Sequence, residues 1–300
     1  MRRAVVALGG NALLEDAADS FEAQLATVRE TVGHLTALDR AGYDLLLTHG
    51  NGPQVGNRLL EQEASDETPD LPLDVLVAET QAQVGAMLQR ALDSALDEAY
   101  LTVVTQTVVD PDHPAFDDPT KPIGPVYDEA TARAKPFPVT AVEGGYRRVV
   151  ASPPPEAVIE ASELAAMVER GQGVVCGGGG GVPVVRGRDG IEGVAAVVDK
   201  DHTSRLLATE VDAADLVFVT DVDGVYRDYG GPDEELLRDV TTADLRALLD
   251  AGEFDDARGS MRPKVRAAVD FLDAGGERAV VTRQEHLEAA LDGEAGTRIA

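Results

Sequence analysis

The chain has 300 residues, enough for one large α/β domain or two ordinary ones, and the 44% that are hydrophobic can form a sizeable core. Its 54 Asp and Glu residues against 26 Lys and Arg residues give a formal net charge of −28. A surface this negative repels nucleic-acid phosphates and anionic lipids, so we expect neither nucleic acid nor a membrane as a partner. No apolar run approaches the ~20 residues of a membrane span. We therefore expect a soluble, cytoplasmic protein.

Two short segments bear on processing and on covalent cross-links. Only five apolar residues, 4–8, follow the basic start of the chain, which is too few for a signal peptide. Cys176 is the one cysteine in the sequence, so an internal disulfide and a cysteine-cluster metal site are excluded.

Lysine is unusually rare in this chain. Four of the 26 basic residues are lysines: Lys121, Lys135, Lys200 and Lys264. An acidic excess with few lysines suggests a halophilic protein from a cytoplasm of very high salt, where screening makes a dense negative surface tolerable. An acidic protein from an arginine-biased genome is the alternative. In either case each remaining lysine is a candidate for a specific role.

Short apolar strands alternate with helical patterns along the chain. The strands are expected at 4–8, 43–48, 101–109, 173–176, 215–220 and 278–282. The helices are expected at 22–38, 79–97, 162–169, 201–210, 243–249 and 260–273. Because the strands are apolar throughout, this alternation predicts a mostly parallel sheet with helices on both faces.

Residues 110–155 interrupt this alternation. They contain more than half of the sixteen prolines and show little apolar periodicity. Tyr127, Phe137 and Tyr146 lie among them, so we interpret the stretch as an inserted lobe or lid rather than a linker. Loops of this length within compact domains are usually functional or disordered.

Glycine-rich loops follow three of the expected strands, at 9–10, 50–52 and 177–181. A glycine loop between a strand and a helix exposes backbone N–H groups to an anion, and glycine also allows close approach. One such loop could be an ordinary tight turn. Three of them at the carboxyl edge of a parallel sheet favour an anion-binding site. His49 is the only histidine placed for substrate contact, and we expect it to have no role.

The lysines indicate which chemistry this site performs. No P-loop, dinucleotide fingerprint or protein-kinase motif is present. Lys200 lies where a strand turns into a helix, Lys264 lies near a helix start for which Ser260 is the expected N-cap, and Lys121 lies in the irregular lobe. Lysines at helix starts beside anion loops suit phosphoryl transfer, in which the protein positions groups and neutralises charge. Lys135 matches no motif, and its replacement by arginine should change little.

Six motifs together resemble the carbamate kinases of the amino acid kinase superfamily. They are VALGGNAL at 6–13, THGNGPQVG at 48–56, PTKPIGP at 119–125, VDKD at 198–201, TDVDGVY at 220–226 and GSMRPK at 259–264. TDVDGVY is shared across the superfamily, whereas GGNAL, HGNGPQVG and PTKPIGP are particular to carbamate kinases. The resemblance extends from residue 4 to about residue 282. Cys176 and His202 depart from the family pattern without removing a catalytic group.

The resemblance implies an α/β fold, an open three-layer αβα sandwich with a mostly parallel central sheet and a protruding lid, assembled as a homodimer. Residues 1–190 would form the carbamate-binding lobe, with the lid at about 110–155, and residues 191–300 the nucleotide-binding lobe. The implied reaction is the reversible conversion of ATP and carbamate to ADP and carbamoyl phosphate. Mg²⁺ would be held mainly by the nucleotide phosphates, with no protein metal site. Arginine catabolism with ATP formation is the implied setting.

The resemblance also assigns residues. Lys200 and Lys264 would flank the transferred phosphoryl group, Asp201 would orient them, and Lys121 would reach in from the lid. The residues implied for carbamate and phosphoryl binding are Gly9, Gly10, Asn11, Gly50, Asn51, Gly52, Gly178 and Gly179. Those implied for the nucleotide are Asp221, Val225, Tyr226, Ser260, Met261 and Pro263.

Carbamate suits these residues because its attacking oxygen is already charged, so no general base is required. Two alternatives remain at this point. Another amino acid kinase could use the same nucleotide lobe on a different acid, which the PTKPIGP motif argues against. A nucleotide-binding regulator without turnover would not need Lys121, Lys200, Asp201 and Lys264 together.

Overall fold

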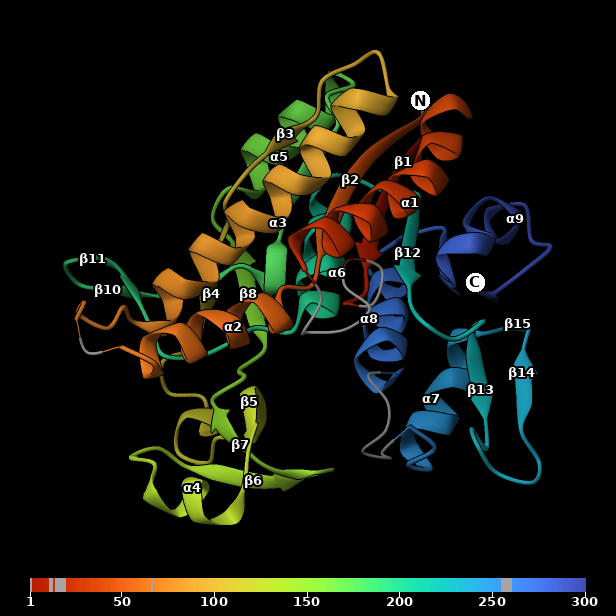
Figure 1. The fold of residues 1–300 in the computed structure, drawn as a ribbon. Coiled ribbons are helices and arrows are strands. Elements are labelled where there is room, and N and C mark those ends of the chain that lie inside the picture. The colour runs from red at the N-terminus through yellow and green to blue at the C-terminus, as the bar shows by residue number, and fades with distance from the viewer. Residues whose placement is uncertain (1, 11–12, 14–19, 66, 255–260) are drawn as a thin grey trace.

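The computed structural model describes residues 2–10, 13, 20–65, 67–254 and 261–300 (Figure 1). Its main sheet has eight strands in the order β15-β17-β16-β12-β1-β2-β9-β3. Neighbouring strands are parallel except for the antiparallel pair β16 and β17. The strands are β1 (Arg2–Leu8), β2 (Tyr43–His49), β3 (Leu101–Thr102), β9 (Val174–Cys176), β12 (Asp215–Val219), β15 (Asp239–Val240), β16 (Arg278–Thr282) and β17 (Thr297–Ile299).

Strand β1 shows how the sheet is covered on both faces. Successive side chains of a strand point to opposite faces. Val5 and Ala7 join one buried cluster, which includes residues of α5 (Ala161–Glu169), α6 (Lys200–Glu210), α7 (Thr242–Asp250) and α8 (Met261–Asp273). Ala4, Val6 and Leu8 join a second cluster, with residues of α1 (Phe21–Arg40), α3 (Leu73–Ala95) and α9 (Leu287–Leu291). The protein is therefore a three-layer αβα sandwich, which confirms the predicted fold class.

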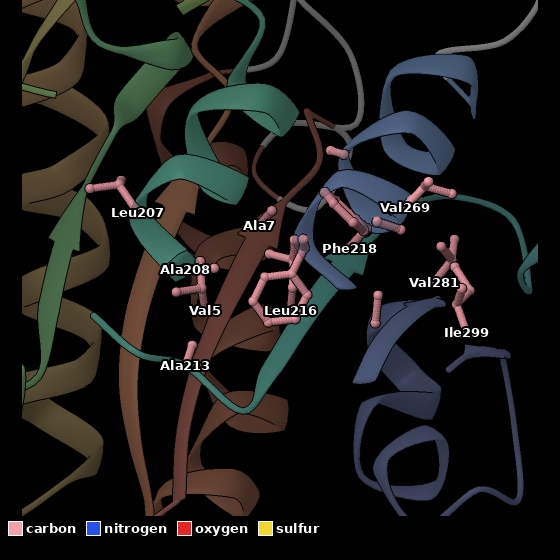
Figure 2. Close-up of a cluster of buried hydrophobic side chains, with 14 of the residues drawn as sticks. Val5, Ala7, Leu207, Ala208, Ala213, Leu216, Phe218, Val269, Val281 and Ile299 are labelled. Carbon is pink, nitrogen blue, oxygen red and sulfur yellow. The ribbon is translucent and has the colours of Figure 1, made fainter. Parts of the chain in front are cut away.

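Figure 2 shows side chains of the first of these clusters in close-up. Phe218 of β12 is completely buried, and Leu207 of α6 and Val269 of α8 extend toward the same face of the sheet. Burying a side chain of this size contributes about 1.5–3 kcal/mol. This packing fixes α6 and α8 on the sheet and thereby sets the positions of their first turns.

A second, smaller sheet has the order β11-β10-β4-β8. It consists of β4 (Gln106–Val109), β8 (Pro155–Val158), β10 (Val182–Gly187) and β11 (Gly190–Gly193), and helix α2 (Gly52–Glu63) shares its core cluster. The single strand expected at 101–109 was wrong, because β3 and β4 belong to different sheets. The chain leaves the main sheet near Thr105, whose N–H and hydroxyl donate to the Gln81 side chain at 3.1 Å each.

The proline-rich stretch forms the projection at the bottom of Figure 1. It contains a three-stranded sheet, β5-β7-β6, from β5 (Lys121–Tyr127), β6 (Val139–Val142) and β7 (Gly145–Val150), together with α4 (Glu129–Ala134). We call this sheet and α4 the lid. The sequence did not reveal these strands because β5 carries two prolines, which a strand tolerates at a sheet edge or a bulge.

The structure also contains elements that were not predicted or that begin at other residues than expected. Helix α2 was not predicted, and α3 begins at Leu73, directly after Pro72, rather than at residue 79. A hairpin of β13 (Val225–Arg227) and β14 (Glu235–Leu237) follows β12. The predicted lobe boundary at residue 190 falls at the turn between β10 and β11. In the described part of the chain, no helix is both long and apolar enough to cross a membrane.

Candidate active site

A cavity of about 440 Å³ opens where the carboxyl ends of β1, β2 and β12 meet α6, α8 and the lid. It lies at the edge of the parallel sheet where ligands of α/β folds bind. Eleven of the sequence-predicted site residues line it: Gly9, Gly10, Gly50, Asn51, Gly52, Lys121, Gly179, Lys200, Asp201, Asp221 and Lys264. Asn11 lies outside the described residues. The structure thus brings together groups that are up to 255 positions apart in the sequence (residues 9 and 264).

Asp201 lies between two lysines at the inner wall of this cavity. Its Oδ1 accepts from Lys200 Nζ, and its Oδ2 accepts from Lys264 Nζ at 3.0 Å. The side chains of Lys200, Asp201 and Lys264 are only 12%, 4% and 4% exposed. Two ammonium groups are therefore held next to each other by one carboxylate, away from bulk water.

Burial and charge act in opposite directions on these groups. Burial alone would raise the pKa of Asp201, but Lys200 and Lys264 outweigh it and hold that pKa well below its usual range. Burial lowers the pKa of Lys200, and Lys264 lowers it further, whereas Asp201 raises it. Asp201 consequently remains ionised and keeps a protonated lysine favourable at this buried position.

Asp199 connects the lid to the same helix. It is the N-cap of α6, and its Oδ1 accepts from the N–H of Asp201 at 2.9 Å. Its Oδ2 accepts from Lys121 Nζ, at the start of the lid strand β5, at 3.2 Å. Lys121 of the lid and Lys200 of α6 therefore line the same cavity, and Asp199 at the start of α6 contacts the lid lysine.

The glycine loops supply space and donors in different ways. The N–H groups of Gly9 and Gly50 donate to the Val219 and Leu8 carbonyls at 2.9 and 3.2 Å, although both residues line the first cavity. At Gly10 and Gly52, in contrast, an added Cβ would meet no atom within 4 Å. Both positions line the first cavity and, as far as the described residues go, have open space beside them.

The glycine tract after β9 is shaped by close packing. Gly179 has φ +61°, and a Cβ there would lie 2.0 Å from Asn51 Oδ1, so only glycine fits. Gly178 does not line the cavity, because it is buried against Gln81 and His49. The tract therefore lets the Asn51 loop sit deep in the site, where the Asn51 amide also donates to Thr80 Oγ1 at 3.0 Å.

His49 is buried beneath the loop that follows β2. Its Nδ1 lies 2.9 Å from the Gly50 carbonyl oxygen. Burial, together with the positive charge of Lys200, lowers the pKa of His49 to about 4, against a favourable contribution from the Gly50 hydrogen bond. His49 is therefore neutral at pH 7 and supports the Gly50 backbone.

A second cavity of about 470 Å³ adjoins the first, since Thr220 and Asp221 line both. Tyr226 and Tyr229 line it with ring centroids 5.5 Å apart, and Met261 completes an apolar wall. An aromatic and apolar pocket suits a planar base. Of the residues assigned to the nucleotide, Asp221, Tyr226 and Met261 are thus placed at this cavity.

Two other nucleotide assignments, Val225 and Pro263, line neither cavity. Val225 is completely buried in the core, and its N–H donates to Thr297 Oγ1 at 2.7 Å. Pro263 occupies the first turn of α8 without lining a cavity. Ser260 lies outside the described residues. Val225 and Pro263 directly precede Tyr226 and Lys264, which line the second and the first cavity respectively.

The comparisons with known proteins agree on one family. The sequence pattern of the amino acid kinase family matches residues 2–283. The chain belongs to the amino acid kinase family. A carbamate kinase of Halobacterium salinarum is 50% identical over 304 residues, which cover 100% of this chain and 98% of that protein. A carbamate kinase of Pyrococcus furiosus is 43% identical over 312 residues, which cover 99% of each chain.

Solved structures share the fold of this chain. A carbamate kinase from Giardia lamblia bound to AMP-PNP superposes with a TM-score of 0.91 at 38% identity, covering 99% of this chain and 98% of that one. N-acetylglutamate synthase from Neisseria gonorrhoeae gives a TM-score of 0.60 at 14% identity, which shows a shared fold alone.

Three residues of this amino acid kinase's site were missed in the sequence. Arg147 of the lid strand β7 lines the first cavity, its Nε donates to the Gly124 carbonyl at 2.9 Å, and burial lowers its pKa. Asp199 and Tyr229 have the contacts described above. Asp199 lies within the VDKD motif and Tyr229 lies three residues after TDVDGVY, so the motifs could have suggested both, whereas only the folding of the lid brings Arg147 to the site.

Proposed function

We propose that this amino acid kinase is a carbamate kinase, which transfers a phosphoryl group reversibly between ATP and carbamate. The observation that carries the proposal is the buried Lys200–Asp201–Lys264 group in the wall of the first cavity. Two ammonium groups at this point stabilise charge that spreads over the phosphoryl oxygens in the transition state. Full-length similarity of 41–50% to carbamate kinases supports the same activity.

The reaction requires charge and position rather than proton transfer. In the direction of ATP formation, an oxygen of the ADP β-phosphate attacks the phosphorus of carbamoyl phosphate. The bond between phosphorus and the carbamate oxygen breaks, and carbamate leaves with the electron pair. No proton moves in this step, which suits a site whose histidine, His49, is neutral and hydrogen-bonded to Gly50. Lys121 and Arg147 of the lid, which line the cavity, add positive charge and exclude water.

The nucleotide fits the paired cavities by size and chemistry. The base would occupy the pocket of Tyr226, Tyr229 and Met261, and the phosphates would extend past Asp221 toward Lys264. Gly10 and Gly52 leave room for phosphoryl and carbamate oxygens. Asp221 lines both cavities, so its carboxylate is the oxygen donor we assign to Mg²⁺, most of whose ligands come from nucleotide phosphates and water. When bound, Mg²⁺ neutralises phosphate charge.

Several finer points belong to this proposal. We assign carbamate to the lobe of residues 1–190 and the nucleotide to residues 191–300, with a homodimer as the assembly. We also propose that the reaction takes place in the cytoplasm, in arginine catabolism with net ATP formation. The net charge of −28 and the four lysines support a halophilic protein.

The test is ATP formation from ADP and carbamoyl phosphate in molar KCl, followed with a luminescent ATP assay. The expected result is ATP production that depends on both substrates and on Mg²⁺. A parallel panel of other acyl phosphates and acidic acceptors separates this activity from that of a related amino acid kinase. Turnover of a different acid, with none of carbamoyl phosphate, would overturn the proposal.

A further inference from the structure

Helix α2 and the lid strand β5 both start at the active site. Gly52, the first residue of α2, and Lys121, the first residue of β5, line the first cavity. Twelve helical residues and seven strand residues each span roughly 20 Å. The two elements therefore have matching lengths, and they end at Glu63 and Tyr127, far from the reacting groups.

The middle of this pair is a close backbone contact. A Cβ at Gly56 of α2 would lie 3.5 Å from Gly124 Cα in β5. Gly124 has φ +72°, in the region that favours glycine, and a Cβ there would lie 3.4 Å from Leu59 Cδ1. A Cβ at either position would make an ordinary van der Waals contact, so the helix and the strand lie close together at this point. The lid strand thus rests directly on α2.

The far ends of α2 and β5 are joined by a polar cluster. Glu63 Oε1 accepts from the Tyr127 hydroxyl at 2.6 Å, and Glu63 Oε2 accepts from Lys135 Nζ at 2.7 Å. Lys135 Nζ also lies 4.6 Å from the centre of the Tyr127 ring. We call Glu63, Tyr127 and Lys135 the lid anchor. It accounts for the one lysine of this chain that does not line the active-site cavity.

The lid anchor is only partly shielded from water and salt. The side chains of Glu63 and Lys135 are 27% and 20% exposed, and the Phe137 ring lies 6.2 Å from that of Tyr127. Exposed ion pairs contribute little and are screened in molar salt, where the Debye length is about 3 Å. A partly buried pair that also has a phenol hydrogen bond and a cation–π contact is less affected.

We propose that the lid anchor positions Lys121 for the reaction by fixing the far end of β5 to α2. Glu63, Tyr127 and Lys135 are positioning residues, since none of them lines the cavity. With one end of β5 fixed, Lys121 is restricted to the space between Asp199 and the bound substrates. Without the anchor, the lid samples open arrangements, and Lys121 meets the reactants in a smaller fraction of encounters. This inference rests on the proposed phosphoryl transfer, in which Lys121 contacts the reactants.

The test compares Glu63→Gln with the wild type in the ATP-forming assay in molar KCl. We expect kcat/KM for carbamoyl phosphate to fall about tenfold, which corresponds to about 1.4 kcal/mol, while the affinity for ADP is unchanged. The same substitution in a Lys121→Ala background should have little further effect, because the anchor acts through Lys121. Lys135→Arg should keep most of the activity, since arginine can make the same ion pair and ring contact.

Arg133→Gln is the matched control. It removes another lid cation, whose partner Glu129 and own side chain are 61% and 77% exposed, and it should leave kcat/KM unchanged. The inference would be overturned if Glu63→Gln kept the wild-type kcat/KM, or if it lowered kcat/KM equally in the wild type and in the Lys121→Ala background. If Glu63→Gln does not fold, Tyr127→Phe provides the same comparison by removing only the hydroxyl. An inactive wild type would instead contradict the proposed function.

Discussion

Replacing Asp201 by asparagine exchanges one carboxylate oxygen for an amide nitrogen, and this change should lower both the stability and the activity of the protein. The substitution keeps the shape of the side chain but leaves Lys200 and Lys264 buried without their shared carboxylate. At the 3.0 Å separation from Lys264 Nζ, the Coulomb attraction is about 5 kcal/mol at an effective dielectric constant of 20. Removing one partner of a buried pair costs about 3–5 kcal/mol. Because folded proteins are stable by only about 5–15 kcal/mol, we expect Tm to fall by about 5–15 °C.

The pH dependence of the Asp201→Asn variant follows from the same charges. Asp201 has a lowered pKa in the folded protein, so its contribution to stability is present above the unfolded pKa of about 4 and is lost as the pH falls through the lower folded value. The stability difference between wild type and variant should therefore shrink in acid. Lys200 loses the partner that raises its pKa, so the decline of kcat at alkaline pH should move to lower pH.

Thermal melts by circular dichroism and the ATP-forming assay, both in molar KCl, measure these effects. Asp212→Asn is the control, because Asp212 is 99% exposed and its pairing with Arg3 is 3.8 Å long. We expect kcat to fall at least ~10²-fold in Asp201→Asn and to stay unchanged in the control. A variant with Tm within about 2 °C of wild type and kcat within tenfold would refute the central role of this carboxylate.

Three further predictions concern the lysines, the lid and salt. Lys200→Ala and Lys264→Ala should each lower kcat by at least ~10²-fold, measured at saturating substrates. Equal and mild losses of kcat on replacing Lys121, Lys135, Lys200 and Lys264 in turn would contradict the assignment of Lys200 and Lys264 to transition-state stabilisation. Deleting the lid tip within 110–155 should leave a folded protein that still binds ATP, as measured by calorimetry, but has little turnover. If the deletion variant kept its kcat, the lid would have no role in the reaction. Dialysis to about 0.01 M salt, where the Debye length is about 30 Å, should dissociate the proposed dimer first and then unfold the protein. Equal circular dichroism and light scattering at ~0.05 M and ~3 M KCl would contradict this dependence on salt.

The sheet and the helices on it were predictable because their patterns are local. The apolar runs of β1, β2, β12 and β16 lie within one or two residues of the expected positions, since burial on both faces demands continuous apolar sequence. The strand at 101–109 was predicted as one element because β-branched residues continue through it. The break at Thr105 depends on Gln81, 24 positions away, which no local pattern reveals.

The residues of the active site were likewise predictable where the signal was local and unpredictable where it depended on the folded structure. Lys200 and Lys264 were identified because lysine is rare in this chain and both lie near helix starts, and the resemblance added Asp201. The structure adds that one carboxylate contacts both lysines. The engagement of Gly9 N–H with β12 could not be foreseen, because a glycine loop looks alike whether it extends a sheet or binds a ligand. Lys135 matched no motif, yet it forms an ion pair with Glu63 that exists only once the lid has folded onto α2.

Phosphorus NMR of the wild-type enzyme with ADP, Mg²⁺ and carbamoyl phosphate in molar KCl tests the central claim most directly. It follows the phosphoryl group itself, and it distinguishes transfer from hydrolysis. The account predicts that the carbamoyl phosphate signal declines while the γ-phosphate signal of ATP grows in step, with Lys264→Ala slowing both changes together. Growth of inorganic phosphate in place of ATP at the same enzyme-dependent rate, or an unchanged spectrum from a folded protein, would contradict it.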